Sequence, residues 1–328
     1  MRTVRIWTLV LGALAAVFLG GCSEKTEEAN FTFVVIGDTR PGGGDRITQP
    51  AVHLKSIEEI NLLAPELVVN VGDFILGYNS GEGFDLTFKQ WDEFDRVVKE
   101  LKMPLYLAPG NHDIWDERSQ EVYEKRYGAP YYSFDKGGCH FVILCSDLAK
   151  PKEAGSITGD QLVWLRNDLE QNAVPGRTFV FLHQPLWQQV HVSGAAKAGW
   201  MKDVHPLLVQ HRVHTVFAGH VHAYEYDSID GVGYIITGGG GAALARPEIT
   251  GGFHHYMTVT VTPKETSLAV IPVGSIKPQE VVSAEFRRKF EGMSASADIK
   301  TLVVGKDSLD DIPVTFELKN VLDQPLKV

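Results

Sequence analysis

Five short polar clusters in this sequence carry the residue types that bind divalent metal ions in proteins. Carboxylate and amide oxygens and imidazole nitrogens donate lone pairs to such ions, and each cluster directly follows an apolar run. Because the strands of an open α/β sheet present their carboxyl ends at one edge, we expect these clusters to converge although they are far apart in the chain. The clusters are Gly37-Asp38-Thr39-Arg40, Gly72-Asp73, Gly110-Asn111-His112-Asp113, His183 and Gly219-His220-Val221-His222.

The order of the clusters is more informative than any one of them. A Gly-Asp pair after a strand is ordinary turn chemistry, and a His-x-His sequence places both rings on one face of any strand. Five such clusters in series, each at a strand end, are not what structural turns produce. Two cations about 3.5–4 Å apart repel each other, so a carboxylate has to bridge them, and such a pair activates water and binds phosphoryl oxygens.

The series resembles the motifs of the calcineurin-like metallophosphoesterases, which run D-x-H, GD, GNH[DE], H and GHxH. The resemblance covers Phe31 to Val273, and the segments YYSFDKGGCHFVILCSD and GDQLVWLRNDLE look like the part of that family between its third and fourth motifs. It implies a four-layer α/β/β/α sandwich and a metal-dependent hydrolase of small-molecule phosphoesters, either monoesters or diesters. The implied cofactors are two divalent metal ions, and mixed nitrogen and oxygen ligands suit Mn, Fe or Zn better than Ca.

The same resemblance implies a role for each matching residue. His112 would donate a proton or a hydrogen bond to the leaving-group oxygen, and Asp113 would orient His112. The implied metal ligands are Asp73 as the bridge, Asn111, His183 and His220 at one ion, and Asp38 and His222 at the other.

Arg40 is the position at which this chain departs from the family pattern. It stands where the motif has the histidine of D-x-H, and a guanidinium has no lone pair to give to a metal ion. We expect Arg40 to bind the substrate phosphate instead, or else to be a surface arginine. The alternative function that Arg40 leaves open is a catalytically impaired envelope lipoprotein that binds phosphorylated ligands on the same fold.

Two further features bear on the substrate and the subgroup. Purple acid phosphatases would have tyrosine three residues after the bridging aspartate, and Leu76 stands there, so the sequence disfavours that subgroup. Tyr78, Trp187, His191 and Trp200 lie in loops after the motif strands and are candidates for the substrate rim.

The apolar pattern predicts an α/β domain followed by antiparallel strands. Short runs rich in β-branched residues alternate with longer amphipathic stretches up to about residue 224, after which hairpins follow. The expected strands are 31–36, 67–71, 105–108, 140–145, 179–182, 213–218, 224–229, 234–237, 256–261 and 267–273, and the expected helices are 48–63, 84–101, 119–127, 158–171 and 279–290. Cys139 and Cys145 flank one strand and are expected to be buried free thiols.

The two ends of the chain are expected to serve other purposes. Arg2 and Arg5 precede the apolar run Ile6–Leu19, and Leu19-Gly20-Gly21-Cys22 resembles a bacterial lipoprotein signal. The resemblance implies cleavage before Cys22 and lipidation of Cys22, whereas a transmembrane anchor would need about 20 apolar residues. We therefore expect a protein of the cell envelope, anchored by lipid in the outer or the cytoplasmic membrane.

The expected division of the chain follows from these patterns. Residues 1–21 are a signal peptide, 22–30 a tether, 31–274 the metallophosphoesterase domain and 275–298 a helical linker. Residues 299–328 are a β-rich segment that either packs on the domain or begins an incomplete one. The net charge of −10 and the absence of a dense basic block in the sequence argue against a nucleic-acid scaffold as partner.

Overall fold

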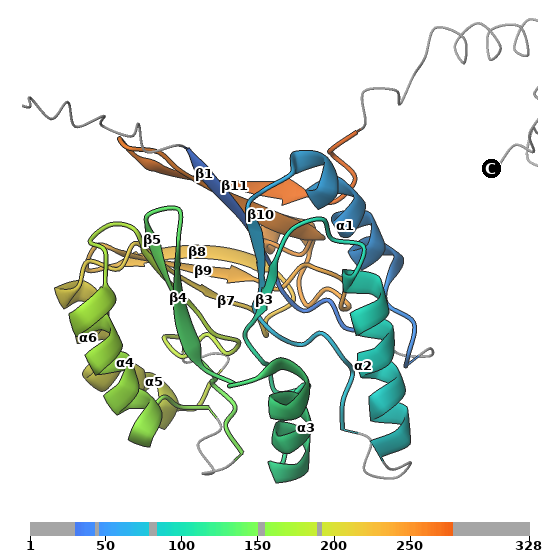
Figure 1. The fold of residues 1–328 in the computed structure, drawn as a ribbon, viewed down its shortest axis with the longest axis horizontal. Coiled ribbons are helices and arrows are strands. Elements are labelled where there is room, and N and C mark those ends of the chain that lie inside the picture. The colour runs from blue at the N-terminus through green and yellow to red at the C-terminus, as the bar shows by residue number, and fades with distance from the viewer. Residues whose placement is uncertain (1–29, 43–45, 79–83, 150–154, 189–191, 278–328) are drawn as a thin grey trace, which may run out of the picture.

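The computed structural model describes residues 30–42, 46–78, 84–149, 155–188 and 192–277 (Figure 1). Its strands are β1 (Phe31–Ile36), β2 (Leu67–Asn70), β3 (Leu105–Leu107), β4 (Tyr132–Lys136), β5 (Cys139–Ile143), β6 (Thr178–Phe181), β7 (Thr215–Ala218), β8 (Tyr224–Ile229), β9 (Val232–Thr237), β10 (His255–Val261) and β11 (Thr266–Pro272). Its helices are α1 (Ala51–Leu63), α2 (Phe84–Val98), α3 (Glu117–Tyr127), α4 (Gly159–Asn172), α5 (Gly194–Gly199), the π-helical turn η1 (Trp200–Val204), α6 (His205–Gln210) and the 3-10 turn η2 (Glu248–Thr250).

The strands form two mixed sheets that pack face to face. The five-stranded sheet has the order β11-β10-β1-β2-β3, and the six-stranded sheet has the order β4-β5-β6-β7-β9-β8. The strands that carry the motifs run parallel to one another within each sheet, β1, β2 and β3 in the first and β6 and β7 in the second. Phe33 of β1 fills the space between the sheets, with its ring centroid 5.0 Å from those of Phe141 and Phe179.

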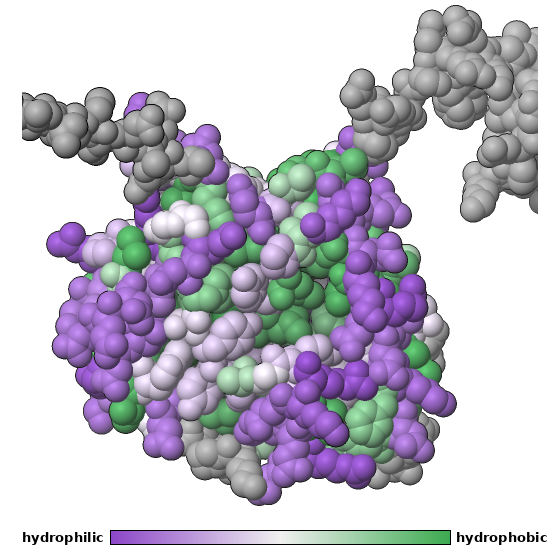
Figure 2. Space-filling model, viewed as in Figure 1, coloured by the Kyte–Doolittle hydropathy of each residue, from purple (hydrophilic) through white to green (hydrophobic). Residues whose placement is uncertain are grey.

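Helices cover the outer faces of both sheets (Figure 1). Ile60 of α1 packs against Val34 and Val68 of the five-stranded sheet. Leu165 of α4 and Leu208 of α6 belong to the cluster on the outer face of the six-stranded sheet. In the view of Figure 2, polar side chains cover the outer helices and apolar ones show between them. The predicted four-layer α/β/β/α arrangement is confirmed.

Two helices support the loop that follows β2. Phe74, directly after Asp73, has no exposed surface and stacks on Phe94 of α2 with ring centroids 4.5 Å apart. Tyr123 of α3 lies in the same apolar cluster. Because a buried aromatic side chain removes a large apolar area from water, this packing fixes the backbone beside Asp73.

Most of the expected elements are present, and the misses have a local reason. All ten expected strands occur, but β4 and the run from α5 to α6 were not expected. β4 is half-exposed and polar, so it lacks the apolar pattern of a strand. Cys139 and Cys145 are buried free thiols as expected. The signal peptide, Cys22, the expected helix 279–290 and the segment 299–328 lie outside the described residues.

Within the described residues, the helices are all too short or too polar to cross a lipid bilayer.

A buried histidine links β5 to α4. His140 Nδ1 lies 2.7 Å from Asp135 Oδ1, and His140 Nε2 lies 2.9 Å from Asp168 Oδ2. Burial lowers the pKa of His140, but the hydrogen bonds and charges of Asp168 and Asp135 have the larger combined effect, and the pKa of His140 is raised overall. Burial raises the pKa of Asp168, but the hydrogen bond from His140 leads the effects that lower it overall. The charged pair therefore stabilises the folded state.

We predict that Asp168→Asn lowers the free energy of unfolding by about 3 kcal/mol near pH 6, because it breaks a buried pair by removing one partner. The unfolded pKa values are about 6.5 for histidine and about 3.9 for aspartate. The wild type and the variant should differ most in free energy of unfolding at pH values between these two pKa values. The difference should decline as the pH rises through the raised pKa of His140. Urea unfolding across this pH range measures it, with the exposed Glu170→Gln on the same helix as control. A difference independent of pH would contradict the prediction.

Candidate metal centre

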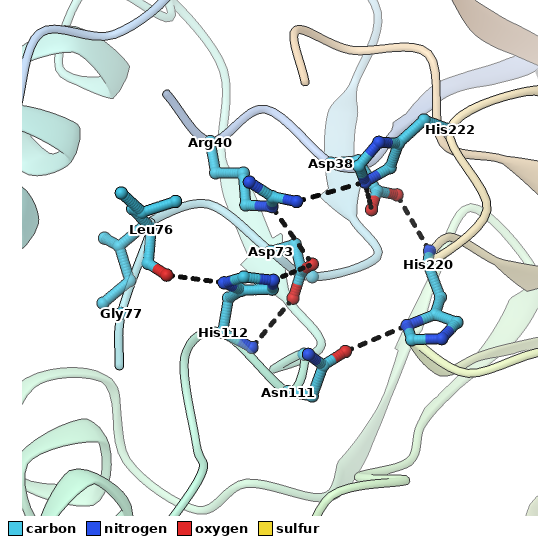
Figure 3. A network of polar contacts seen from close by, with 12 residues as sticks. Asp38, Arg40, Asp73, Leu76, Gly77, Asn111, His112, His220 and His222 are labelled. Carbon is cyan, nitrogen blue, oxygen red and sulfur yellow. Dashed lines mark hydrogen bonds and ion pairs between the residues drawn. The ribbon is translucent and has the colours of Figure 1, made fainter. Parts of the chain in front are cut away.

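The loops after five strands bring the predicted site residues to one rim of the molecule (Figure 3). Each loop starts at the carboxyl end of a parallel strand, where open α/β sheets form their sites. Asp38 and Arg40 follow β1, Asp73 follows β2, Asn111 and His112 follow β3, His183 follows β6, and His220 and His222 follow β7.

Backbone contacts hold the loops against one another. The amide of Asp38 donates to Gly72 O and that of Arg40 donates to Asp73 O, each over 2.9 Å. Asp38, Asp73 and His220 have positive φ values of 55°, 57° and 67°. A non-glycine residue in this left-handed region costs about 1–2 kcal/mol and persists only where its surroundings enforce it. The candidate ligands thus sit on a strained backbone that the neighbouring loops hold in place.

Two motif glycines are required because their backbone lies very close to the carboxylates of Asp73 and Asp38. A Cβ atom on Gly110 would collide with Asp73 Oδ1, and a Cβ atom on Gly219 would collide with Asp38 Oδ2. Only glycine lets the chain pass so near these carboxylates.

Asp113 has a different role from the one we predicted. Its carboxylate accepts hydrogen bonds from the backbone amides of Gly110 and Asp73, both over 2.8 Å, and of Phe74 and Ile75 over 3.1 and 3.3 Å. The ring of His112 is instead oriented by Leu76, whose carbonyl oxygen accepts from Nδ1 over 2.5 Å. The prediction that Asp113 orients His112 is wrong, because its oxygens are already directed to the backbone of two loops.

One group of candidate ligands surrounds His183. His183 Nδ1 donates to Val71 O over 2.8 Å, which leaves Nε2 with its lone pair, 3.1 Å from Asp73 Oδ1. This buried Nε2 atom has no hydrogen-bond partner. Asn111 Oδ1 lies 2.9 Å from His220 Nδ1, and Asn111 Nδ2 donates to Tyr78 OH over 3.0 Å. The lone pairs of this group fit a divalent metal ion.

The second group joins Asp38, Asp73 and His222, whose candidate ligand atoms all lie within 4.8 Å of one another. His222 Nδ1 donates to Ala243 O over 2.6 Å, and His222 Nε2 lies 3.4 Å from Asp38 Oδ1. That oxygen is buried without a hydrogen-bond partner. The three ligand atoms are therefore close enough to share one ion.

The electrostatics of the rim reflect the buried carboxylates. Burial lowers the pKa of His183, but the charge of Asp73 outweighs burial and raises the pKa to about 10. Burial raises the pKa of Asp73, but the nearby charge of His183 leads the effects that lower that pKa overall. Both shifts show that the buried carboxylate of Asp73 attracts positive charge, which a divalent ion at this rim would also supply.

His112 lies at the edge of this cluster. Its backbone amide donates to Asp73 Oδ1 over 3.0 Å, and its Nε2 atom lies 3.8 Å from Asp73 Oδ2. Burial lowers the pKa of His112. With Nδ1 occupied by Leu76, Nε2 is the atom that can meet a reacting group.

Arg40 points into the cluster. Its Nε atom lies 3.5 Å from Asp73 Oδ2, its Nη2 atom lies 3.5 Å from His222 Nε2, and its side chain is 16% exposed. The alternative expectation of a surface arginine is therefore wrong.

A cavity of about 590 Å³ adjoins the candidate ligands Asn111 and His220. Tyr78 lines it as expected, whereas Trp187 and Trp200 are buried in the core and His191 lies outside the described residues. Several lining residues are not predicted from the sequence, among them Trp115, Asp147 and Gln184. Asp147 could have been found, because it lies just after β5 as the other clusters follow their strands. Burial raises its pKa to about 6.

Comparison with known proteins adds a family and several relatives. A family model described as calcineurin-like phosphoesterase matches residues 31–224, more than half of the chain. Purple acid phosphatase 15 of Arabidopsis thaliana is 29% identical over 221 residues, which are 54% of this chain and 40% of that protein. The human serine/threonine-protein phosphatase CPPED1 is 27% identical over 230 residues, which are 64% of this chain and 71% of that protein.

The solved structures agree on the fold. A dimetal phosphatase from Danio rerio has a TM-score of 0.59 at 17% identity, over 74% of this chain and 96% of that one. The chain spans less than half the length of the first curated relatives it matches. Purple acid phosphatases are among these relatives although Leu76 led us to disfavour that subgroup, so the missing tyrosine does not remove the overall similarity.

Proposed function

Because this chain belongs to the calcineurin-like phosphoesterase family, we propose that it is a metal-dependent hydrolase of small-molecule phosphoesters, either monoesters or diesters. The observation that carries the proposal is the buried carboxylate of Asp73, which lies between the His183 group and the Asp38 and His222 group. A carboxylate in this position can bridge two ions. The names of the relatives, both phosphatases, support the same reaction class.

The proposed cofactors are two divalent ions, for which Mn, Fe and Zn suit the nitrogen and oxygen donors. Bound there, they would polarise the phosphoryl oxygens and lower the pKa of a water molecule. The proposed ligands are Asp73, Asn111, His183 and His220 at one position and Asp38, Asp73 and His222 at the other.

The chain's own residues position the ester for attack. The hydrogen bond from Nδ1 to Leu76 O fixes the ring of His112, so that Nε2 is available to the leaving-group oxygen. Arg40 offers its guanidinium donors to the phosphate oxygens from beside Asp73 Oδ2, the oxygen that His112 Nε2 also approaches. Asp113 holds the loops that carry both Asp73 and Asn111.

We predict that Asp73→Asn lowers turnover by more than ~100-fold and lowers bound metal, because loss of a ligand exceeds the 10–100-fold effect of losing an outer partner. Metal analysis and hydrolysis of chromogenic mono- and diesters by the same samples measure both effects. Asp203→Asn, a half-exposed aspartate on η1, is the control.

Removal of metal by a chelator should also abolish hydrolysis, and a divalent ion should restore it. Metal-free protein that kept its full rate would refute the proposal. Bound metal without turnover of any ester would favour the binding protein instead.

We propose that the leaving group of the ester lies in the cavity beside Asn111. Tyr78 and Trp115 both line this cavity, and their rings lie 5.5 Å apart, so one side of the cavity is aromatic. Such a wall favours a leaving group with a flat apolar face.

We predict that Trp115→Leu raises KM for a 4-nitrophenyl ester roughly 3- to 10-fold, as expected for an aromatic contact of about 0.5–1.5 kcal/mol. Methyl phosphate, which has no aromatic leaving group, should be affected much less. Steady-state kinetics with both esters measure the ratio of the variant's KM to the wild-type KM, and Trp164→Leu on α4 is the matched control. An equal rise in KM for both esters would place the leaving group elsewhere.

We also propose that a lipid on Cys22 anchors the protein in the cell envelope. The support is the sequence of Arg2, Arg5, the apolar run Ile6–Leu19 and Cys22. Mass spectrometry of the N-terminal peptide, isolated from membranes of the native host, should find Cys22 at the N-terminus and acylated. An unmodified Cys22 in the processed protein would rule out the anchor, and Cys22→Ser should abolish processing.

A further inference from the structure

Arg40 lies beside one of the two proposed metal positions and carries a positive charge of its own. Its Nε atom faces Asp73 Oδ2 and its Nη2 atom faces His222 Nε2, both at 3.5 Å (Figure 3). The side chain is largely buried, and the backbone amide of Arg40 is tied to Asp73 O. A guanidinium stays protonated at all relevant pH values, so this charge is permanent.

Arg40 competes with a metal ion for the same lone pair. His222 Nδ1 donates to Ala243 O, so the ring has a single lone pair, on Nε2. That lone pair accepts a hydrogen bond from Arg40 Nη2, and it cannot bind an ion at the same time. An ion between Asp38 and His222 would also lie next to a like charge, which is repelled most strongly where water is excluded.

The other position has a fuller set of donors. His183 Nδ1 donates a hydrogen bond to Val71 O, which directs the other ring nitrogen, Nε2, toward the site. Asn111 Nδ2 donates to Tyr78 OH, which orients the amide so that Oδ1 can act as a ligand. His183 Nε2 is a buried atom without a hydrogen-bond partner. With His220 and Asp73, this position offers four protein ligands, whereas the Arg40 position offers three.

We propose that Arg40 is the resident cation of the position formed by Asp38, Asp73 and His222, so that the protein retains one divalent ion tightly and takes up a second only by displacing Arg40. This inference rests on the proposed function and limits its two-ion occupancy to the state in which Arg40 is displaced. Arg40 would then supply the positive charge and the phosphate contacts that a metal ion in the second position would otherwise supply. The centre then combines one metal ion with one guanidinium.

The experiment counts metal ions on the full chain purified in mild detergent. After equilibration with MnCl₂ and gel filtration, we expect inductively coupled plasma mass spectrometry to find about one manganese ion per wild-type chain. Arg40→Ala and Arg40→His should retain a second ion, with affinity for it raised at least ~10-fold, and most in Arg40→His because it adds a ligand. Arg40→Lys keeps a cation and should stay at one ion, and Arg96→Ala, an exposed arginine of α2, should behave as wild type.

The wild-type protein alone also tests the inference if the variants fail to fold. Its electron paramagnetic resonance spectrum with manganese should be that of an isolated ion, whereas a carboxylate-bridged pair is magnetically coupled. Two tightly held, coupled ions in the wild type would overturn the role of Arg40 and leave the proposed function standing. An active protein that retains no ion would overturn the proposed function itself.

Discussion

The burial of two neighbouring carboxylates is the constraint on which the site depends. Asp38 and Asp73 are 0% and 2% exposed, and a carboxylate so far from water loses its charge unless positive or hydrogen-bonding groups compensate for it. His183, His222 and Arg40 supply that compensation in the structure described here. The balance of these charges decides what the rim can bind. A divalent ion and the guanidinium of Arg40 are alternative sources of the positive charge that these two carboxylates need.

The rigidity that such a cluster requires comes from the backbone rather than from the ligands themselves. Asp113 accepts four backbone hydrogen bonds from the loops after β2 and β3, and Phe74 fixes the same segment to α2. These contacts hold the loop of Asp73, and the amide of Asp38 is bound to Gly72 O in the same loop, so both residues keep positive φ angles. A preorganised set of donors loses little entropy when it binds an ion or a phosphate, which is how a rim of loops can act as a rigid site.

The sequence by itself determined the layers of the fold and the residue types at its rim. Apolar period and turn residues are local properties, so β1 and β8 could be predicted to the residue, and the polar clusters after β1, β2, β3, β6 and β7 could be assigned to one edge. The half-exposed β4 was missed because its strand is held by pairing with β5, a contact that its own sequence does not display.

Only the tertiary structure decided which of these side chains meet. Arg40 could equally have faced solvent, and its approach to Asp73 and His222 depends on loops that are brought together by strand order. Asp113 was assigned to His112 because they are neighbours in sequence, yet its oxygens meet the backbone of residues about 40 positions away. Trp115 and Asp147 converge on one cavity from different segments. Contacts between distant loops depend on packing geometry in three dimensions, which no local pattern of residues specifies.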